Sequence, residues 1–254
     1  MSRTLPSGII ARLKGVCNLG PVQKSAKDNP ADSSKSSLAS RPGAALLTRA
    51  IILVGGLVLL SVFARAMDYF PGDPYVSRWI QTWQSPWLDS VMKWISLLGE
   101  PAPAAVTFIV FAGLILLTTG LKNAGFLATS ALATFVLNLG LKFAVERPRP
   151  SFTMVRVVTE EGGHSFPSAH TMYLTVLLGL FIFFMSLYLK PGWVKRTVQI
   201  ASIAFLLATG VSRIYLGAHW MSDVIGGYLF GLAILWLTIW LYRTKIFRQK
   251  HRHI

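Results

Sequence analysis

Residues 123–141 read NAGFLATSALATFVLNLGL, a stretch that contains no charged side chain. A helix of about 20 such residues is long enough to cross the roughly 30 Å hydrocarbon core of a bilayer. The stretch is apolar all round, which distinguishes it from the amphipathic helix of a water-soluble domain. It therefore predicts a helix that spans a membrane.

Five other stretches share this pattern. Uncharged, apolar segments occupy residues 50–64, 101–121, 171–189, 198–212 and 224–240, and the shorter ones need flanking residues to complete a span. Helices are favoured because a backbone inside lipid must satisfy its own hydrogen bonds. We predict an all-α, polytopic membrane protein with six transmembrane helices in one domain, residues 46–244.

The overall composition supports this class. The chain is 53% hydrophobic and only 14% charged, against about 25% charged residues in a usual soluble domain. Its net charge of +15 would suit a nucleic-acid partner, but no basic–aromatic stripe accompanies it. We therefore predict no nucleic-acid partner, and we assign the basic residues to the cytoplasmic side of a membrane. The single Cys17 excludes an intrachain disulfide and a multi-cysteine zinc site.

Lys and Arg residues set the predicted topology. They gather in residues 1–45, which read as a flexible basic tail, at Lys122, in residues 190–196 and in the C-terminal tail, residues 245–254. Six spans place all of these on one side, which is then cytoplasmic. The bacterial inner membrane, with the opposite face toward the periplasm or exterior, fits this arrangement. An organelle membrane fits as well, because the serine-rich first segment also resembles a transit sequence.

Three segments fall on the opposite, extracytoplasmic side: residues 65–100, 142–170 and 213–223. The first is too polar to span but contains Trp79, Trp83, Trp87 and Trp94. Tryptophan favours the membrane–water interface, so we expect one or two interfacial amphipathic helices there, with Trp79 and Trp83 on one face. Anchoring to the bilayer and a substrate lid are both compatible with this pattern.

The segment 142–170 carries two candidate sites. Lys142 and Arg149 follow the third span, and the prolines beside Arg149 are expected to end the helix and free that side chain to turn inward. The pair either binds an anion or extends its cations to the interface. Arg147 and Arg156 are expected to be plain interfacial charges.

The second site precedes the fourth span. Here Ser168 and the N–H groups of Ala169 and His170 suit either an anion site at a helix start or an ordinary helix cap.

The segment 213–223 adds a third candidate site. His219 and Asp223 are four residues apart, so on a helix they share one face, and a carboxylate beside an imidazole fixes its tautomer. Arg213 adds a cation at the end of the fifth span. The topology brings all three clusters to one face. They hold three cations and two histidines but no carboxylate cluster of the kind that Mg²⁺ requires. Such a site favours phosphoryl transfer with cations as the neutralising groups and His as a nucleophile.

These residues resemble a known family. Lys142-x6-Arg149-Pro150, Pro167-Ser168-Ala169-His170 and Ser212-Arg213-x5-His219-x3-Asp223 are similar, in the same order, to the three-part pattern of the type-2 phosphatidic acid phosphatase family. The resemblance covers about residues 45–244. The sequence departs from the pattern at Ala169, where the family usually has Gly. Ala would cost about 1 kcal/mol if this position needs a positive φ, whereas a residue in the first helical turn tolerates the change, and we favour the second view.

The resemblance implies a role for each matched residue. His219 attacks phosphorus, Asp223 orients it, and His170 protonates the leaving oxygen and then activates water. Lys142, Arg149, Ser168, the Ala169 amide and Arg213 bind the phosphoryl oxygens.

The function expected from this resemblance is metal-independent, cofactor-free hydrolysis of a lipid phosphate or lipid diphosphate through a phosphohistidine. The partners are then the bilayer and its lipid substrate, with undecaprenyl diphosphate and phosphatidic acid among the candidates. A lipid-to-lipid phosphotransferase using the same site is the alternative. A transporter is disfavoured because the ionisable residues gather near one surface rather than at the membrane midplane.

Overall fold

A computed structural model describes residues 42–250, with side chains described for residues 47–244. Within that range the chain forms eight helices and loops. They are α1 (Pro42–Ala66), α2 (Asp73–Gln81), α3 (Pro86–Leu97), α4 (Pro101–Thr119), α5 (Leu121–Val145), α6 (Ala169–Tyr188), α7 (Trp193–Tyr215) and α8 (Met221–Lys250). All except α2 and α3 are long and apolar enough to cross a membrane. The predicted all-α fold with six spans is confirmed.

The helix ends differ from the predicted domain limits. Most of the two predicted tails, residues 1–41 and 251–254, lies outside the described range. Helix α1 begins at Pro42, and α8 continues through Lys250, because its last turns contain neither Gly nor Pro. Helix α5 ends at Val145, ahead of Pro148, with Glu146 in the left-handed conformation that commonly closes a helix. The prediction that the prolines end this helix is confirmed.

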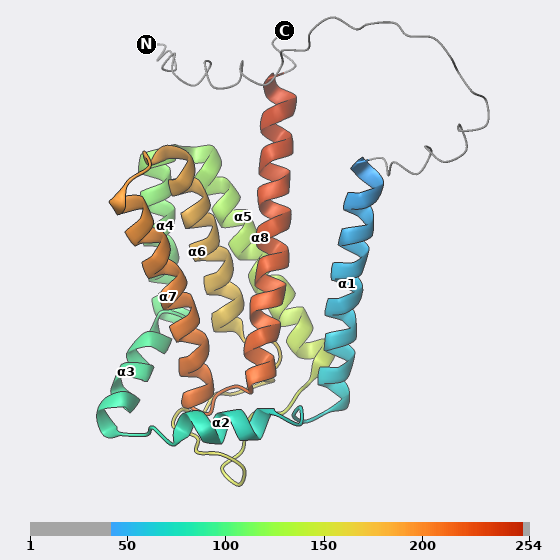
Figure 1. The fold of residues 1–254 in the computed structure, drawn as a ribbon, viewed down its shortest axis with the longest axis vertical. Coiled ribbons are helices and arrows are strands. Elements are labelled where there is room, and N and C mark those ends of the chain that lie inside the picture. The colour runs from blue at the N-terminus through green and yellow to red at the C-terminus, as the bar shows by residue number, and fades with distance from the viewer. Residues whose placement is uncertain (1–41, 251–254) are drawn as a thin grey trace, which may run out of the picture. The chain divides into compact units, whose positions relative to one another are not determined.

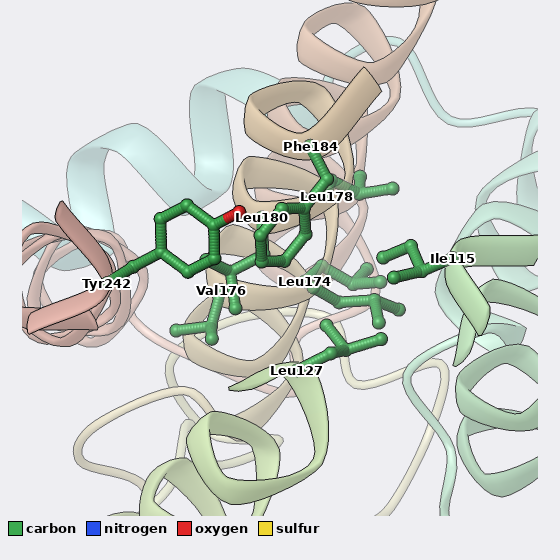
Figure 2. Close-up of a cluster of buried hydrophobic side chains, with 9 residues drawn as sticks. Ile115, Leu127, Leu174, Val176, Leu178, Leu180, Phe184 and Tyr242 are labelled. Carbon is green, nitrogen blue, oxygen red and sulfur yellow. The ribbon is translucent and has the colours of Figure 1, made fainter. Parts of the chain in front are cut away.

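Helix α6 is the centre of the bundle. It packs against α4, α5, α7 and α8, and Figure 1 shows it enclosed by these helices. Buried side chains of α6, including Leu174, Leu180 and Phe184, meet Ile115 of α4 and Tyr242 of α8 (Figure 2). The most buried span is therefore also the one that begins at the predicted phosphate-binding motif.

Two glycines bring α8 close to α6. A Cβ at Gly227 would collide with the Ser168 carbonyl and Thr171, and one at Gly231 would collide with Thr175 and the Met172 carbonyl. Glycines four residues apart allow close helix packing inside a membrane, where van der Waals contact drives association. As a result the two helices also start side by side, and the Ser168 amide donates to the Asp223 carbonyl at 3.1 Å.

Helices α2 and α3 lie at the end of the bundle that carries the α5–α6 loop and the α7–α8 connection (Figure 1). Helix α2 is fastened there by Gln81, whose amide donates to the Arg156 and Tyr215 carbonyls at 2.7 and 3.0 Å. Arg156 pairs with Asp89 of α3, and its guanidinium lowers the pKa of that carboxyl to about 2. One or two helices were predicted for residues 65–100, and two are present. Trp83, however, lies beyond the end of α2 and does not share a helical face with Trp79.

Helix α1 is separated from the bundle by an apolar groove. The groove has a volume of 670 Å³ and runs between α1, α5 and α8. Among the α1 side chains that the structure describes, residues 47–66, only Leu57 and Ala64 are buried, against Val145 and Phe230. At one end of the groove Arg65 pairs with Glu146 and donates to the Ala144 carbonyl, both at 2.9 Å. This ion pair ties α1 to the end of α5 that leads into the candidate site.

The close α6–α8 packing yields a first prediction. Gly231→Val should destabilise the protein by about 1–3 kcal/mol, because the added methyl groups overlap the α6 backbone and Thr175. The measurement is the melting temperature of the purified protein in detergent. Gly125→Val is the matched control, since a Cβ there meets nothing within 4 Å. Equal melting temperatures for the two variants would contradict the tight contact.

Candidate active site

Two arginines form the positive centre of the candidate site. Arg213, in the last turn of α7, is fully buried, and its guanidinium reaches Ser96 and Glu161. Arg149, beyond the end of α5, donates to the Ala218 carbonyl at 2.8 Å and lies 3.3 Å from Nε2 of His219. Arginine presents a planar fork of donors that matches the oxygens of a phosphoryl group. The structure thus brings both predicted guanidinium groups to the same imidazole.

His219 is held with one nitrogen toward these cations and the other away from them. Its Nε2 faces Arg149, whereas its Nδ1 faces Ser165 at 3.4 Å and Asp223 at 3.6 Å. The side chain is buried, and burial together with the nearby cations lowers the pKa of His219 well below its ordinary value. The imidazole is therefore neutral at physiological pH, with Nε2 directed at the place where an anion would bind.

Ser165 stands between His219 and Asp223. Its hydroxyl donates to Oδ2 of Asp223, which also accepts from the Trp220 amide at 2.9 Å. His219 precedes the first turn of α8, so the four-residue spacing does not place it directly on Asp223 as a continuous helix would. The tautomer with a proton on Nδ1 can donate to Ser165, which leaves the Nε2 lone pair facing Arg149. Sequence reasoning gave Ser165 no chemical role, because a serine before a helix usually reads as a cap.

The start of α6 faces the same site. Ala169 is the first residue of α6 and does not have a positive φ, so Ala is tolerated there. First-turn amides have no partner within the helix and can bind an anion. Among the described side chains, Ser168 is buried and its hydroxyl has no hydrogen-bond partner. Lys142 lies at the edge of the site, where its ammonium donates to the carbonyl of half-buried His164.

His170, also in the first turn of α6, contacts a carboxylate that sequence reasoning missed. Its Nε2 lies 3.3 Å from Oε1 of Glu100, which precedes α4, and Arg213 lies 3.7 Å from the same oxygen. The pairing with His170 holds the pKa of the Glu100 carboxyl below its ordinary value. Glu100 follows α3 in the chain and is far from every motif, so only the fold brings it to His170.

A second carboxylate, Glu161 in the α5–α6 loop, occupies the positive centre itself. Its Oε1 pairs with Arg213, and its Oε2 lies 2.9 Å from Arg149 and 4.0 Å from Nε2 of His219. The Arg149 guanidinium also donates to the carbonyls of Gly162 and Gly163, which follow Glu161. A carboxylate bridging two arginines in front of the imidazole stands where the oxygens of a phosphoryl group would stand.

Glu100 and Glu161 correct the expectation that no carboxylate cluster is present. Together with His170 they bring three possible ligand atoms within 4.8 Å of one another. Arg213 pairs with both glutamates, however, and a divalent cation between them would lie beside its guanidinium. Like charges repel strongly in a poorly hydrated site. The electrostatics therefore favour the glutamates as counter-ions of the arginines.

Arg147 also differs from expectation. It was predicted to be a plain interfacial charge, but it is 1% exposed and pairs with Asp223 at 2.6 Å and with Asp73 at 3.1 Å. Arg156, the other expected interfacial charge, is exposed as predicted. Both arginines lie in the same loop, so their sequence context alone does not separate them.

Comparison with known proteins supports the family suggested by the motifs. Residues 123–247 match the PAP2 superfamily model. Phosphatidylglycerophosphatase B of Bacillus subtilis is 32% identical over 182 residues, which cover 70% of this chain and 87% of that protein. The chain belongs to the PAP2 superfamily. The predicted resemblance to the type-2 phosphatidic acid phosphatases is thereby confirmed.

Two further similarities agree with this family. Undecaprenyl-diphosphatase BcrC of B. subtilis is 28% identical over 149 residues, covering 58% of this chain and 71% of that protein. The crystal structure of a transmembrane PAP2-type phosphatidylglycerolphosphate phosphatase from B. subtilis superposes with a TM-score of 0.65 at 25% identity. That match covers 74% of this chain and 95% of the solved one. Together with the six apolar helices, these similarities identify an integral membrane protein.

The position of Glu161 yields a second prediction. A phosphate ion and the Glu161 carboxylate compete for Arg149 and Arg213, so Glu161→Gln should strengthen competitive inhibition by inorganic phosphate by about tenfold, or ~1.4 kcal/mol. The inhibition constant against lipid phosphate hydrolysis is the measurement. Glu160→Gln, which changes an exposed neighbour in the same loop, serves as the control. An inhibition constant that stays at the wild-type value in Glu161→Gln would exclude this competition.

Proposed function

We propose that this PAP2-family protein hydrolyses a lipid phosphate or lipid diphosphate through a phosphohistidine formed on His219. The observation that carries the proposal is the orientation of His219. Its Nε2 faces Arg149 and the bridged Glu161 carboxylate, while its Nδ1 faces Ser165 and Asp223. A neutral imidazole whose Nε2 lone pair faces Arg149 and the anion site is arranged for nucleophilic attack on phosphorus.

The proposed reaction has two steps. In the first, Nε2 of His219 bonds to phosphorus while the bond from phosphorus to the leaving oxygen breaks, and His170 gives that oxygen a proton. In the second, His170 takes a proton from water, the water oxygen bonds to phosphorus, and the N–P bond breaks to release phosphate. Arg149, Arg213 and the start of α6 neutralise the phosphoryl oxygens in both steps. Glu100 lies 3.3 Å from Nε2 of His170 and orients this imidazole for the proton transfer.

Lipid substrates are proposed on three grounds. The site lies at one end of the apolar helices, and an apolar groove runs beside α1 toward the same end. Two of the relatives are named for phosphatidylglycerophosphate and undecaprenyl diphosphate. A tail held among helices with its phosphate at the helix ends fits this geometry. The alternative, a phosphotransferase, uses the same first step with a lipid hydroxyl in place of water.

We also infer that the site faces the extracytoplasmic side. Lys122 lies in the first turn of α5, Lys190 lies in the α6–α7 connection, and Lys195 and Arg196 lie in the first turn of α7. The α4–α5 and α6–α7 connections lie at the end of the bundle opposite to the site (Figure 1). Positive residues at helix ends stay in the cytoplasm, so we infer that the site end lies outside it. The bacterial inner membrane is the location that this orientation favours.

The nucleophile assignment predicts opposite outcomes for the two histidines. His219→Ala should abolish turnover and leave no labelled phosphoenzyme. His170→Ala should accumulate a phosphoenzyme when the substrate is an aryl phosphate. The first step proceeds because an aryl oxygen leaves without being protonated, whereas the attack of water in the second step still needs a base. The measurements are phosphate release and acid-labile labelling of the protein, with melting temperatures as the folding control. Near-normal activity of His219→Ala would exclude His219 as the nucleophile.

The reaction class and its metal independence are tested together. The purified protein in detergent should release phosphate from a panel of lipid phosphates and diphosphates, and EDTA should leave the rate unchanged. Loss of activity with EDTA, restored by a divalent cation, would instead assign Glu100, Glu161 and His170 to a metal. Phosphate release only in the presence of an acceptor lipid would favour the phosphotransferase.

The orientation of the site is tested by the activity of intact cells toward a soluble short-chain lipid phosphate. Activity found only after the cells are lysed would reverse the inferred orientation.

A further inference from the structure

A second layer of charge lies behind Asp223, on the side away from His219, and the three-part motif does not include it. Nη1 of Arg147 donates to Oδ1 of Asp223 at 2.6 Å and to Ser222 at 2.7 Å. Its Nη2 donates to Asp73 at 3.1 Å, and its Nε donates to the Met67 carbonyl at 3.2 Å. Every nitrogen of this buried guanidinium therefore has a fixed partner.

Asp73 completes this layer from helix α2. One carboxylate oxygen accepts from the Ser222 amide at 2.9 Å, and the other accepts from the Ser222 hydroxyl at 2.6 Å and from the Phe70 amide at 2.8 Å. Asp73 thus caps the first turn of α8 from a different helix. Asp73, Arg147 and Asp223 are each no more than 1% exposed. They form a line of alternating charge that joins α2, the α5–α6 loop and α8.

The two oxygens of Asp223 have separate partners. Oδ2 accepts hydrogen bonds from the Ser165 hydroxyl and the Trp220 amide on the His219 side, whereas Oδ1 accepts from Arg147. A carboxylate held at both oxygens has one orientation, and the Arg147 guanidinium at 2.6 Å balances its charge. When Nε2 of His219 bonds to phosphorus, positive charge develops on the imidazole. A carboxylate fixed in this orientation stabilises that charge through Ser165, so the benefit appears in the chemical step.

We propose that Arg147 is a positioning residue that orients Asp223 and balances its charge, and that Asp73 of α2 is the counter-ion that permits a buried cation there. This inference rests on the proposed phosphohistidine reaction. By this inference α2 contributes to the reaction, because its first residue, Asp73, pairs with the arginine that contacts Asp223. The phosphoryl group lies on the other side of His219, so its binding does not depend on Arg147.

The test separates positioning from a purely structural role. Arg147→Met should lower kcat by about 10- to 100-fold, the usual effect of losing a group that orients a reactive one, and should leave KM within about threefold of wild type. It also leaves two buried carboxylates without a cation, which destabilises the fold. The double variant Asp73→Asn with Arg147→Met removes one of those charges. It should regain much of the melting temperature while kcat stays low, and Arg147→Lys should restore part of kcat.

The matched control is the exposed ion pair of Arg65 and Glu146, 57% and 52% exposed, of which Glu146 is next to Arg147 in the chain. Arg65→Met and Glu146→Gln should leave kcat unchanged. A double variant that recovers both melting temperature and kcat would overturn the positioning role. A rise in KM at constant kcat would overturn it as well, by assigning Arg147 to phosphate binding. An inactive wild-type protein on the lipid panel would instead reject the proposed function, so the two failures are distinct.

Discussion

Repulsion among cations is the constraint on which this structure depends. Arg149 and Arg213 converge on one imidazole at the end of an apolar bundle, where Arg213 has no access to water. Cations gathered in such a place repel one another and lose hydration, so anions must lie among them. Glu161 and Glu100 provide those anions in front of His219, and Asp73 and Asp223 provide them around Arg147. Cation and anion alternate through the site, and a phosphoryl group fits this order by taking the place of Glu161.

Close helix packing holds the charges in register. The glycines of α8 let it approach the α6 backbone, so that Asp223 and Ser168 begin neighbouring helices. Helix α2 then closes the same end through Asp73 and Gln81. Asp223, Ser168 and His170 therefore stand at the starts of packed helices, whereas Glu161 stands on a loop next to two glycines. This difference in support suits a carboxylate that must leave when substrate arrives.

Local patterns in the sequence predict a large part of this arrangement. Runs of apolar residues identify the six spans, the prolines identify the end of α5, and three motifs identify the residues that the fold gathers around His219. Partnerships between distant segments leave no such pattern. Glu100 lies far from every motif, and Arg147 and Arg156 share a loop although one is buried and the other exposed. The spacing of His219 and Asp223 suggests direct contact, but the helix begins too late and Ser165 fills the gap.

The groove beside α1 carries a consequence for the protein outside its native membrane. A bilayer leaves no empty space between apolar surfaces, so hydrocarbon chains fill the 670 Å³ between α1, α5 and α8. Most apolar contacts of α1 are then with lipid tails rather than with the rest of the chain. Solubilisation replaces these tails with surfactant of another length and shape, and the support of α1 changes with it. The annular lipid is in this sense a structural component, and the choice of surfactant becomes a variable of stability.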